Sequence, residues 1–229
     1  MWLASFDIGK KNFAFYIEEI NKEQLLNIKN VPKNKRYKID GTTTPEFSKI
    51  IKNVCLNGKK ILFKNTDITS SSNSKSYIDP EIYHNMIDLL DKYIDYWDKC
   101  DAFVIEKQMA FKKVYNTMAL KLGQHCYSYF CFKYGRFKEI IEFPAYYKTL
   151  ILGAPKIKKT TKTGKISYKA MDKNARKKWS IKKALSIFVE RNDFDSASEL
   201  SSTKKKDDLA DVLCQLQAFK YLVYIERFL

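Results

Sequence analysis

The sequence has few of the residues that build zinc sites or disulfide frameworks. Its 229 residues include only two histidines, His84 and His125, and none of its five cysteines belongs to a C-x-x-C pair. A structural zinc site needs four nitrogen or sulfur ligands at short spacings, so the composition argues against zinc. The odd number of cysteines, spread through apolar segments, favours a protein of a reducing compartment.

Long apolar runs are missing as well. No run approaches the ~20 residues that a membrane-crossing helix needs. Residues 1–5 lead directly to the charged residues Asp7, Lys10 and Lys11, without the apolar region of a signal peptide. We therefore expect a soluble, intracellular protein that does not associate with membranes.

Acidic residues are scarce relative to basic ones. Lysine and arginine together number 42, against 26 aspartates and glutamates, which gives a formal net charge of +16. Such an excess indicates a polyanionic partner, and a basic protein that binds no polyanion is the alternative. Apolar residues make up 45% of the chain, enough for a hydrophobic core, and the length favours a single domain.

The apolar pattern predicts an N-terminal hairpin followed by alternating helices and strands. Residues 2–9 and 13–17 are expected to form two strands joined by a tight turn. Residues 20–58 show no clear pattern, apart from a break at 42–45 that a short helix could follow. Further strands are expected at 60–63, 101–106 and 139–143, and helices at 80–97, 112–134, 180–190 and 205–228. This order predicts an α/β fold with a mixed sheet and helices on its faces.

Four carboxylates in three distant stretches are the most informative feature of the chain. Asp7 and Glu106 each end a short apolar strand, while Asp208 and Asp211 lie three positions apart on one face of a predicted helix. Carboxylates are ligands for hard divalent cations such as magnesium and manganese, and pairs of these ions serve phosphodiester cleavage. In a basic chain, the four carboxylates therefore predict a metal site that works on a phosphate backbone.

Each carboxylate also has a structural interpretation when it is taken alone. An aspartate before glycine, such as Asp7, is common in turns. Glu106 precedes Lys107 and fits an exposed salt bridge. Asp207, Asp208 and Asp211 near a helix start are favoured by the helix dipole, and the lysines at 204–206 are potential partners for them. The ordered combination of all the carboxylates is what favours a metal site.

Three motifs in this order carry a resemblance to a known family. They are Phe6-Asp7-Ile8-Gly9 with Lys11-Asn12, Val104-Ile105-Glu106-Lys107-Gln108, and Lys205-Lys206-Asp207-Asp208-Leu209-Ala210-Asp211. Together they resemble the RuvC-like Holliday junction resolvases, and most closely those of poxviruses and other large DNA viruses. The stretch from Asn116 to Gln124 is similar to the helix that follows the glutamate in that group. Residues 20–78 match nothing in the family pattern.

The resemblance implies a single RNase H-like nuclease domain over residues 1–229, with a mixed five-stranded sheet flanked by helices. It also implies an insertion at 20–78, a homodimer, and paired nicks in four-way DNA junctions by two magnesium or manganese ions per site. The catalytic and metal-binding roles fall on Asp7, Glu106, Asp208 and Asp211. Asp207 fits the family spacing less well than Asp208.

A strongly basic segment supplies candidates for DNA binding. From Lys156 to Lys183 the chain has 11 lysines and Arg176 but a single acid, Asp172. We expect a basic loop at 153–180, whose lysines would contact phosphates and whose flanking tyrosines would stack on bases. A solvated loop or a nuclear-import sequence is the alternative. The residues predicted to bind DNA are Lys10, Lys11, Lys107, Lys156, Lys158, Lys159, Lys162, Lys165 and Arg176.

Two other functions share this sequence pattern. An RNase H-like nuclease that acts on RNA–DNA hybrids or flaps would have the same carboxylates, because the metal site is common to these enzymes. A non-catalytic nucleic-acid-binding module would use the carboxylates only as caps and salt-bridge partners. For a viral resolvase, the expected location is the cytoplasmic site of viral replication or the nucleus.

Overall fold

The structure, a computed structural model, describes residues 1–69, 80–108, 116–160, 164 and 166–228. Contacts between residues divide the chain into two units, each made of two separate stretches of sequence. Unit 1 contains Met1–Ile20 and Lys59–Ala145, and unit 2 contains Asn21–Gly58 and Tyr146–Leu229.

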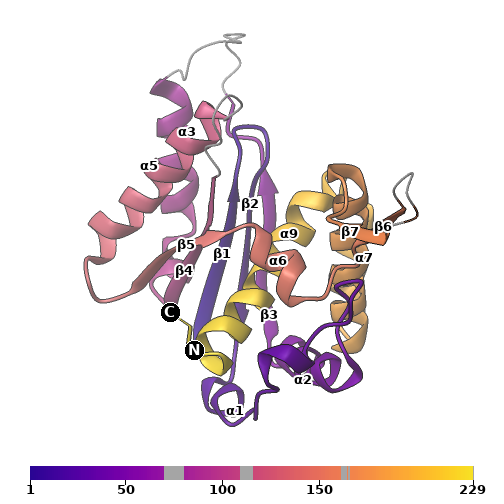
Figure 1. Cartoon of the computed structure of the whole chain (residues 1–229). Helices are drawn as coiled ribbons and strands as arrows, with labels where there is room; N and C mark the ends of the chain where they lie inside the picture. The colour runs from indigo at the N-terminus through magenta and orange to yellow at the C-terminus, as the bar shows by residue number, and fades with distance from the viewer. Residues whose placement is uncertain (70–79, 109–115, 161–163, 165, 229) are drawn as a thin grey trace. The chain divides into compact units, whose positions relative to one another are not determined.

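Unit 1 contains a mixed five-stranded sheet with the strand order β3-β2-β1-β4-β5 (Figure 1). The strand β2 runs antiparallel to both of its neighbours, β3 and β1, whereas β4 and β5 run parallel to β1. The strands are β1 (Trp2–Ile8), β2 (Phe13–Glu19), β3 (Lys59–Thr66), β4 (Cys100–Lys107) and β5 (Glu139–Pro144). The predicted fold class, a mixed five-stranded sheet flanked by helices, is confirmed.

The N-terminal hairpin forms as predicted because its two apolar strands are joined by a short turn. Gly9 and Asn12 close this turn with reciprocal backbone hydrogen bonds of 3.2 and 3.3 Å. The pairing then continues without interruption from Ile8 opposite Phe13 to Trp2 opposite Glu19. The hairpin thereby fixes the position of Asp7 near the end of β1.

Three helices of unit 1 pack on one face of the sheet: α3 (Pro80–Lys92), α4 (Ile94–Trp97) and α5 (Thr117–Tyr134). The core between them is rich in aromatic rings. Phe103 stacks on Phe130 of α5 with ring centroids 4.1 Å apart, and the ring centroids of Trp97 and Phe6 are 5.4 Å apart.

The predicted helix over 112–134 begins at Thr117, where the Asn116 side chain accepts a hydrogen bond from Ala119 N–H. Part of that prediction, residues 112–115, lies outside the described residues.

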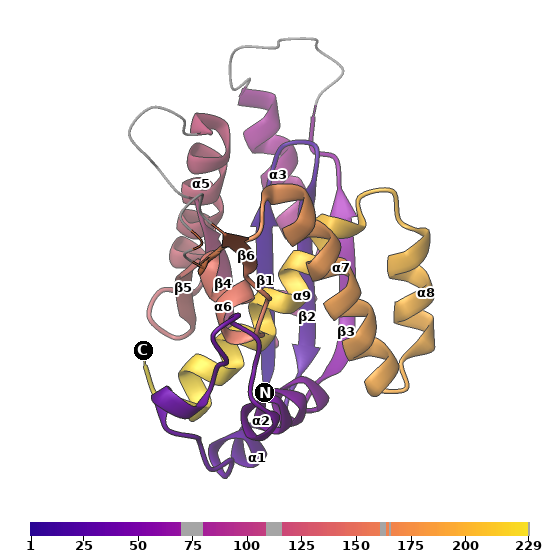
Figure 2. The same ribbon diagram turned by 45° about the vertical axis from the view of Figure 1, so that its right-hand side comes forward.

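Unit 2 is mainly helical, and its helices α7 and α9 lie side by side (Figure 2). A π-helical turn at Tyr221–Ile225 continues α9. The helices of unit 2 are α1 (Lys22–Leu26), a 3₁₀ turn (Lys33–Lys35), α2 (Pro45–Leu56), α6 (Tyr146–Ile151), α7 (Lys173–Glu190), α8 (Phe194–Ser202) and α9 (Lys206–Lys220). The strands of unit 2 are β6 (Ile157–Thr160) and β7 (Ile166–Lys169).

Two segments differ from the sequence-based expectations. The stretch expected as a basic loop, 153–180, contains the β6–β7 hairpin and the start of α7. That helix begins seven residues before its predicted start because the Asp172 side chain caps it by accepting a hydrogen bond from Ala175 N–H at 2.8 Å. Within the stretch expected as an insertion, 20–78, the strand predicted at 60–63 forms as β3 of the central sheet, while residues 21–58 belong to unit 2.

Two further expectations concern membranes and cysteines. Within the described part of the chain, no helix has the length and apolar character to cross a membrane. All five cysteines carry free thiols, and Cys131 is the one that is half-buried rather than buried.

Candidate active site

Asp7 and Glu106 lie on neighbouring parallel strands of unit 1. In the register of β1 and β4, Phe6 pairs with Ile105. Asp7 and Glu106 are the next residues of their strands, and both are half-buried. The two carboxylates therefore lie at the same end of two neighbouring strands.

Both carboxylates belong to the same face of the sheet. Successive side chains of a strand point to opposite faces. Phe6 and Ile105, the residues just before the two carboxylates, lie in the aromatic core under α3 and α5. Asp7 and Glu106 consequently point to the other face, where rigid strands hold them next to each other.

The predicted phosphate-binding lysines of unit 1 follow these strand ends. Lys10 is half-buried in the hairpin turn, and its carbonyl accepts a hydrogen bond from Ile68 N–H at 2.9 Å. Lys11 and Lys107 are exposed. All three lysines lie within four residues of Asp7 or Glu106, so cations accompany the carboxylates at this edge.

Two of the acids of α9 in unit 2 form salt bridges with lysines from two other helices. Lys148 of α6 forms a salt bridge with Asp211 at 3.3 Å, and its side chain is only 7% exposed. Lys177 of α7 pairs with Asp207. The hydrogen bond and charge of Lys177 outweigh the opposing effect of burial and lower the pKa of the Asp207 carboxyl. Asp207 thus has a structural role in joining α7 to α9.

The surroundings of the Asp208 carboxylate differ from those of Asp207 and Asp211. Its Oδ2 atom is buried and has no hydrogen-bond partner among the described residues. Burial, together with the negative charges of Asp207 and Asp211, raises the pKa of Asp208 to about 6. A buried carboxylate oxygen without a partner is costly, so the site as it stands favours an added proton or cation.

The donor atoms at these positions suit a hard divalent cation. Carboxylate oxygens are the preferred protein ligands of magnesium and manganese, and Oδ2 of Asp208 has no hydrogen-bond partner among the described residues. No group of three or more His, Cys, Asp or Glu side chains arranged to hold a metal ion is found among residues 1–69, 80–108, 116–160 and 166–228. Of the predicted ligands, unit 1 contains Asp7 and Glu106, and unit 2 contains Asp208 and Asp211.

The basic segment of unit 2 presents its charges to solvent. Lys158 and Lys159 on β6 are exposed, as are Lys156 just before the strand and Arg176 on α7. Tyr168 pairs opposite Lys158 on β7 and keeps 36% of its surface exposed. The remaining two predicted contacts, Lys162 and Lys165, lie outside the described residues.

Lys148 is a candidate site residue that the sequence analysis missed. It is one of 42 basic residues, and nothing in its immediate neighbours marks it as special. One signal was present: Ile151, three positions later, lies on the same face of a short apolar helix, and Lys148 is therefore on a buried side. Because a lysine is rarely buried without a partner, that placement would have predicted an acid beside it.

Comparison with curated proteins identifies two viral relatives. The chain is 36% identical over 236 residues to uncharacterized protein 170L of Invertebrate iridescent virus 6, an alignment that covers 99% of this chain and 92% of that protein. It is 30% identical over 224 residues to uncharacterized protein 97L of Invertebrate iridescent virus 3, which covers 95% and 98%, respectively. No protein-family model matches the chain.

Comparison with solved structures finds resolvases. The Fowlpox virus resolvase in complex with Holliday junction DNA matches with a TM-score of 0.54 and 17% identity, over 97% of this chain and 99% of that one. The yeast mitochondrial Holliday junction resolvase Ydc2 matches with a TM-score of 0.52 and 10% identity, over 99% and 80%. RuvC of Thermus thermophilus gives a TM-score of 0.51 and 10% identity, over 99% and 97%. At these identities the likeness establishes a shared fold.

Proposed function

Because the chain belongs to the family of the iridescent virus proteins 170L and 97L, and has the fold of the RuvC-like Holliday junction resolvases, we propose that it is a metal-dependent endonuclease that resolves four-way DNA junctions. The observation that carries this proposal is the pair of carboxylates, Asp7 and Glu106, on one face of neighbouring parallel strands. The unpartnered oxygen of Asp208 supports it independently. The setting we propose is viral DNA recombination, or processing of replication intermediates, at the site of viral replication.

The proposed metal ligands are Asp7, Glu106, Asp208 and Asp211, which would hold two magnesium or manganese ions. When bound, such ions activate water and stabilise the oxygen that leaves the phosphorus. The products of this hydrolysis are a 5′-phosphate and a 3′-hydroxyl.

The lysines around the acids have positioning roles in this proposal. Lys148 holds the carboxylate of Asp211 through the 3.3 Å salt bridge, which limits its rotamers before an ion arrives. Lys177 occupies Asp207 in the same way, so that carboxylate is already neutralised and Asp208 is left as the ligand. Lys10, Lys11 and Lys107 would bind the phosphates that flank the cut.

The proposed assembly is a homodimer. Paired nicks across a four-way junction need two active sites at a fixed separation. A symmetric dimer supplies them, because its two-fold axis can coincide with that of the junction.

Neutralising the basic hairpin should weaken DNA binding at low salt. We expect the quadruple change of Lys158, Lys159, Lys162 and Lys165 to alanine to lower affinity and to flatten the dependence of log affinity on log salt. Each phosphate contact contributes about 0.9 to that slope on duplex DNA, so losing up to four contacts should reduce it by up to about 3.6. Titration of a labelled junction at several salt concentrations measures both quantities.

The matched control removes four exposed lysines elsewhere in the chain. An equal change in slope for both quadruple variants would mean that the effect is one of net charge and that the hairpin has no special role in binding. The control positions are Lys29, Lys35, Lys49 and Lys133, each exposed.

The experiment that tests the function is cleavage of a mobile four-way junction with and without magnesium, with both strands followed. A resolvase gives paired, magnesium-dependent nicks in opposing strands of the junction and little cutting of flaps, RNA–DNA hybrids or linear duplex. Preferred cutting of hybrids or flaps would favour the other RNase H-like nucleases. Binding without any metal-dependent cut would favour a non-catalytic module.

A further inference from the structure

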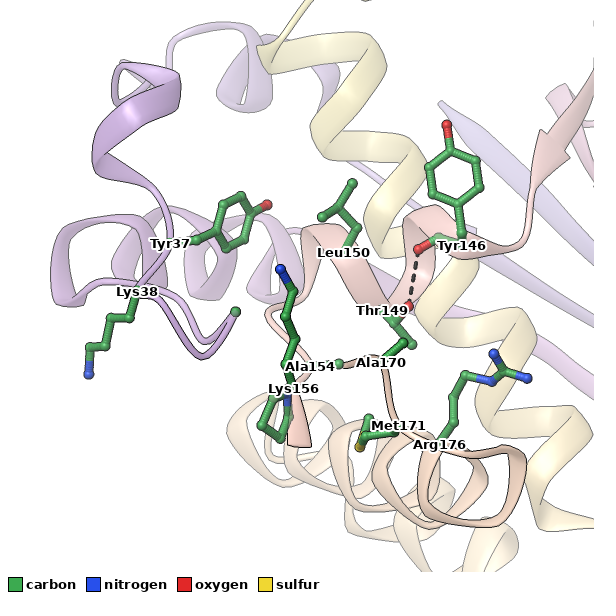
Figure 3. Close-up of a pocket in the computed structure, with 12 residues that line it drawn as sticks. Tyr37, Lys38, Tyr146, Thr149, Leu150, Ala154, Lys156, Ala170, Met171 and Arg176 are labelled. Atoms are coloured by element: carbon green, nitrogen blue, oxygen red, sulfur yellow. Dashed lines mark hydrogen bonds between the residues drawn. The ribbon is translucent and has the colours of Figure 1, made fainter. Parts of the chain in front are cut away.

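Unit 2 contains a pocket that the proposed chemistry does not use (Figure 3). Its volume is about 280 Å³, and 12 residues from three distant segments line it. The first segment, 37–41, belongs to the part of the chain that matched no family pattern. The second runs from α6 to Lys156, and the third joins β7 to α7 and includes Arg176 on that helix.

Tight contacts hold the walls of this pocket in place. Lys156 N–H donates a hydrogen bond of 2.6 Å to the carbonyl of Asp40. Gly153 has φ of +72°, and a Cβ there would lie 2.6 Å from Cγ2 of Thr43. Because the backbone is closely packed at this glycine with positive φ, the walls have little freedom to move. The pocket is therefore formed before any ligand binds.

The lining is aromatic and apolar, with cations but no acid. Tyr37 and Lys156 lie on the side opposite Tyr146 and Arg176, and the amine of Lys38 points away (Figure 3). None of the described residues that line the pocket is an aspartate or glutamate. Such a combination suits a flat aromatic ring joined to a negatively charged group, because rings stack on tyrosine and phosphates pair with arginine and lysine.

Both the size and the place of the pocket match one nucleotide. Pockets for drug-sized ligands hold about 300–1,000 Å³, and this pocket of about 280 Å³ is close to the lower limit of that range, which suits a small ligand such as one nucleotide. Lys156 directly precedes β6 and Ala170 directly follows β7, so the pocket lies at the base of the exposed basic hairpin. A DNA strand bound along that hairpin would pass the mouth of the pocket.

We propose that this pocket binds one unpaired nucleotide of a DNA strand, with its base against Tyr37 and Tyr146 and its phosphate at Lys156 or Arg176. The inference rests on the proposed binding of branched DNA and deepens it. A base that becomes unpaired where the arms of branched DNA meet would be bound whatever its identity, because base stacking on an aromatic side chain is tolerant of sequence. The pocket gives residues 37–41 a role in selecting distorted DNA over perfect duplex.

The test compares four-way junctions that differ in a single unpaired nucleotide. The fluorescent base 2-aminopurine is placed, unpaired, at successive positions along one arm, and binding is measured without divalent ions so that no strand is cut. For at least one position we expect about tenfold tighter binding than to the fully paired junction, with quenched fluorescence as the base stacks.

Two variants remove the pocket in different ways. Ala170→Trp fills it, and Tyr146→Ala removes one aromatic wall, so both should lose the tenfold preference while their affinity for the fully paired junction stays within about twofold. Tyr168→Ala is the matched control, because this exposed tyrosine of β7 is not among the residues that line the pocket. It should keep the preference. Circular dichroism establishes that each variant is folded.

Each other outcome overturns the inference in a recognisable way. A preference that is absent, or that survives in both pocket variants, shows that the pocket does not select unpaired nucleotides, while binding of the fully paired junction leaves the proposed function intact. Free deoxyadenosine monophosphate that binds wild type but not Ala170→Trp, with no preference among junctions, assigns the pocket to free nucleotides. A protein that binds no junction at all overturns the proposed function as well.

Discussion

Replacing Asp7 with Asn, or Glu106 with Gln, is expected to abolish magnesium-dependent nicking of a four-way junction while junction binding is retained. Each change keeps the size of the side chain but removes a carboxylate that the proposed ions need. Mutating a residue that only hydrogen-bonds to a metal ligand already lowers metal affinity or activity about 10–100-fold. For the ligands themselves we therefore expect a loss of at least about 100-fold. The measurement is the single-turnover rate of strand cleavage with saturating enzyme.

A carboxylate on the neighbouring strand supplies the control. Glu142 of β5 pairs in register with Ile105, next to Glu106, and its side chain is exposed. Glu142→Gln should therefore cleave as wild type does. If Asp7→Asn and Glu106→Gln also cleave at the wild-type rate, the two carboxylates are structural and the proposed active site is wrong.

Asp208→Asn should have opposite effects on stability and on activity. In the metal-free protein, burial raises the pKa of Asp208 to about 6, so its charged form destabilises the folded state. The uncharged amide removes that penalty, and after allowance for solvent screening we expect a gain of about 1 kcal/mol at pH 7.5 in EDTA. For a chain of this size, that is an increase in Tm of about 2–4 °C. Metal-dependent cleavage should be lost in the same variant.

The pH dependence identifies the cause of that gain. Between about pH 4 and pH 6 the unfolded chain loses the proton of Asp208 while the folded chain keeps it, so wild-type stability falls as pH rises through this window. The advantage of Asp208→Asn should therefore grow from about pH 4 to pH 6 and stay constant above. Thermal unfolding in EDTA at several pH values measures it.

Asp207 provides the matched comparison on the same turn of α9. Its pair with Lys177 lowers its pKa despite burial, so Asp207→Asn should reduce stability at pH 7.5 and leave cleavage in place. A lower Tm for Asp208→Asn would show that the charged carboxylate is stabilised in the metal-free protein. A loss of cleavage in Asp207→Asn would make that residue a ligand instead of a structural partner of Lys177.

The sequence alone determined the strands that carry Asp7 and Glu106. These strands were predicted from local features: short apolar runs, a turn of the type found at Gly9–Asn12, and an acid at the end of each run. Local geometry of this kind depends little on the rest of the chain. The order of these elements was also enough to predict a mixed sheet. The start of α7 was missed, although its signal was local too: Asp172 is an N-cap residue hidden in a run of lysines.

The tertiary structure decided the state of each acid on α9 and the existence of the pocket. In sequence, Asp207, Asp208 and Asp211 are three similar acids near a helix start. Lys177 and Lys148, 30 and 63 positions away from their partners, distinguish them, and Asp208 keeps an oxygen without a partner. The pocket likewise joins Tyr37, Tyr146 and Arg176. Contacts at such separations depend on how the helices pack, which periodicity and spacing do not encode.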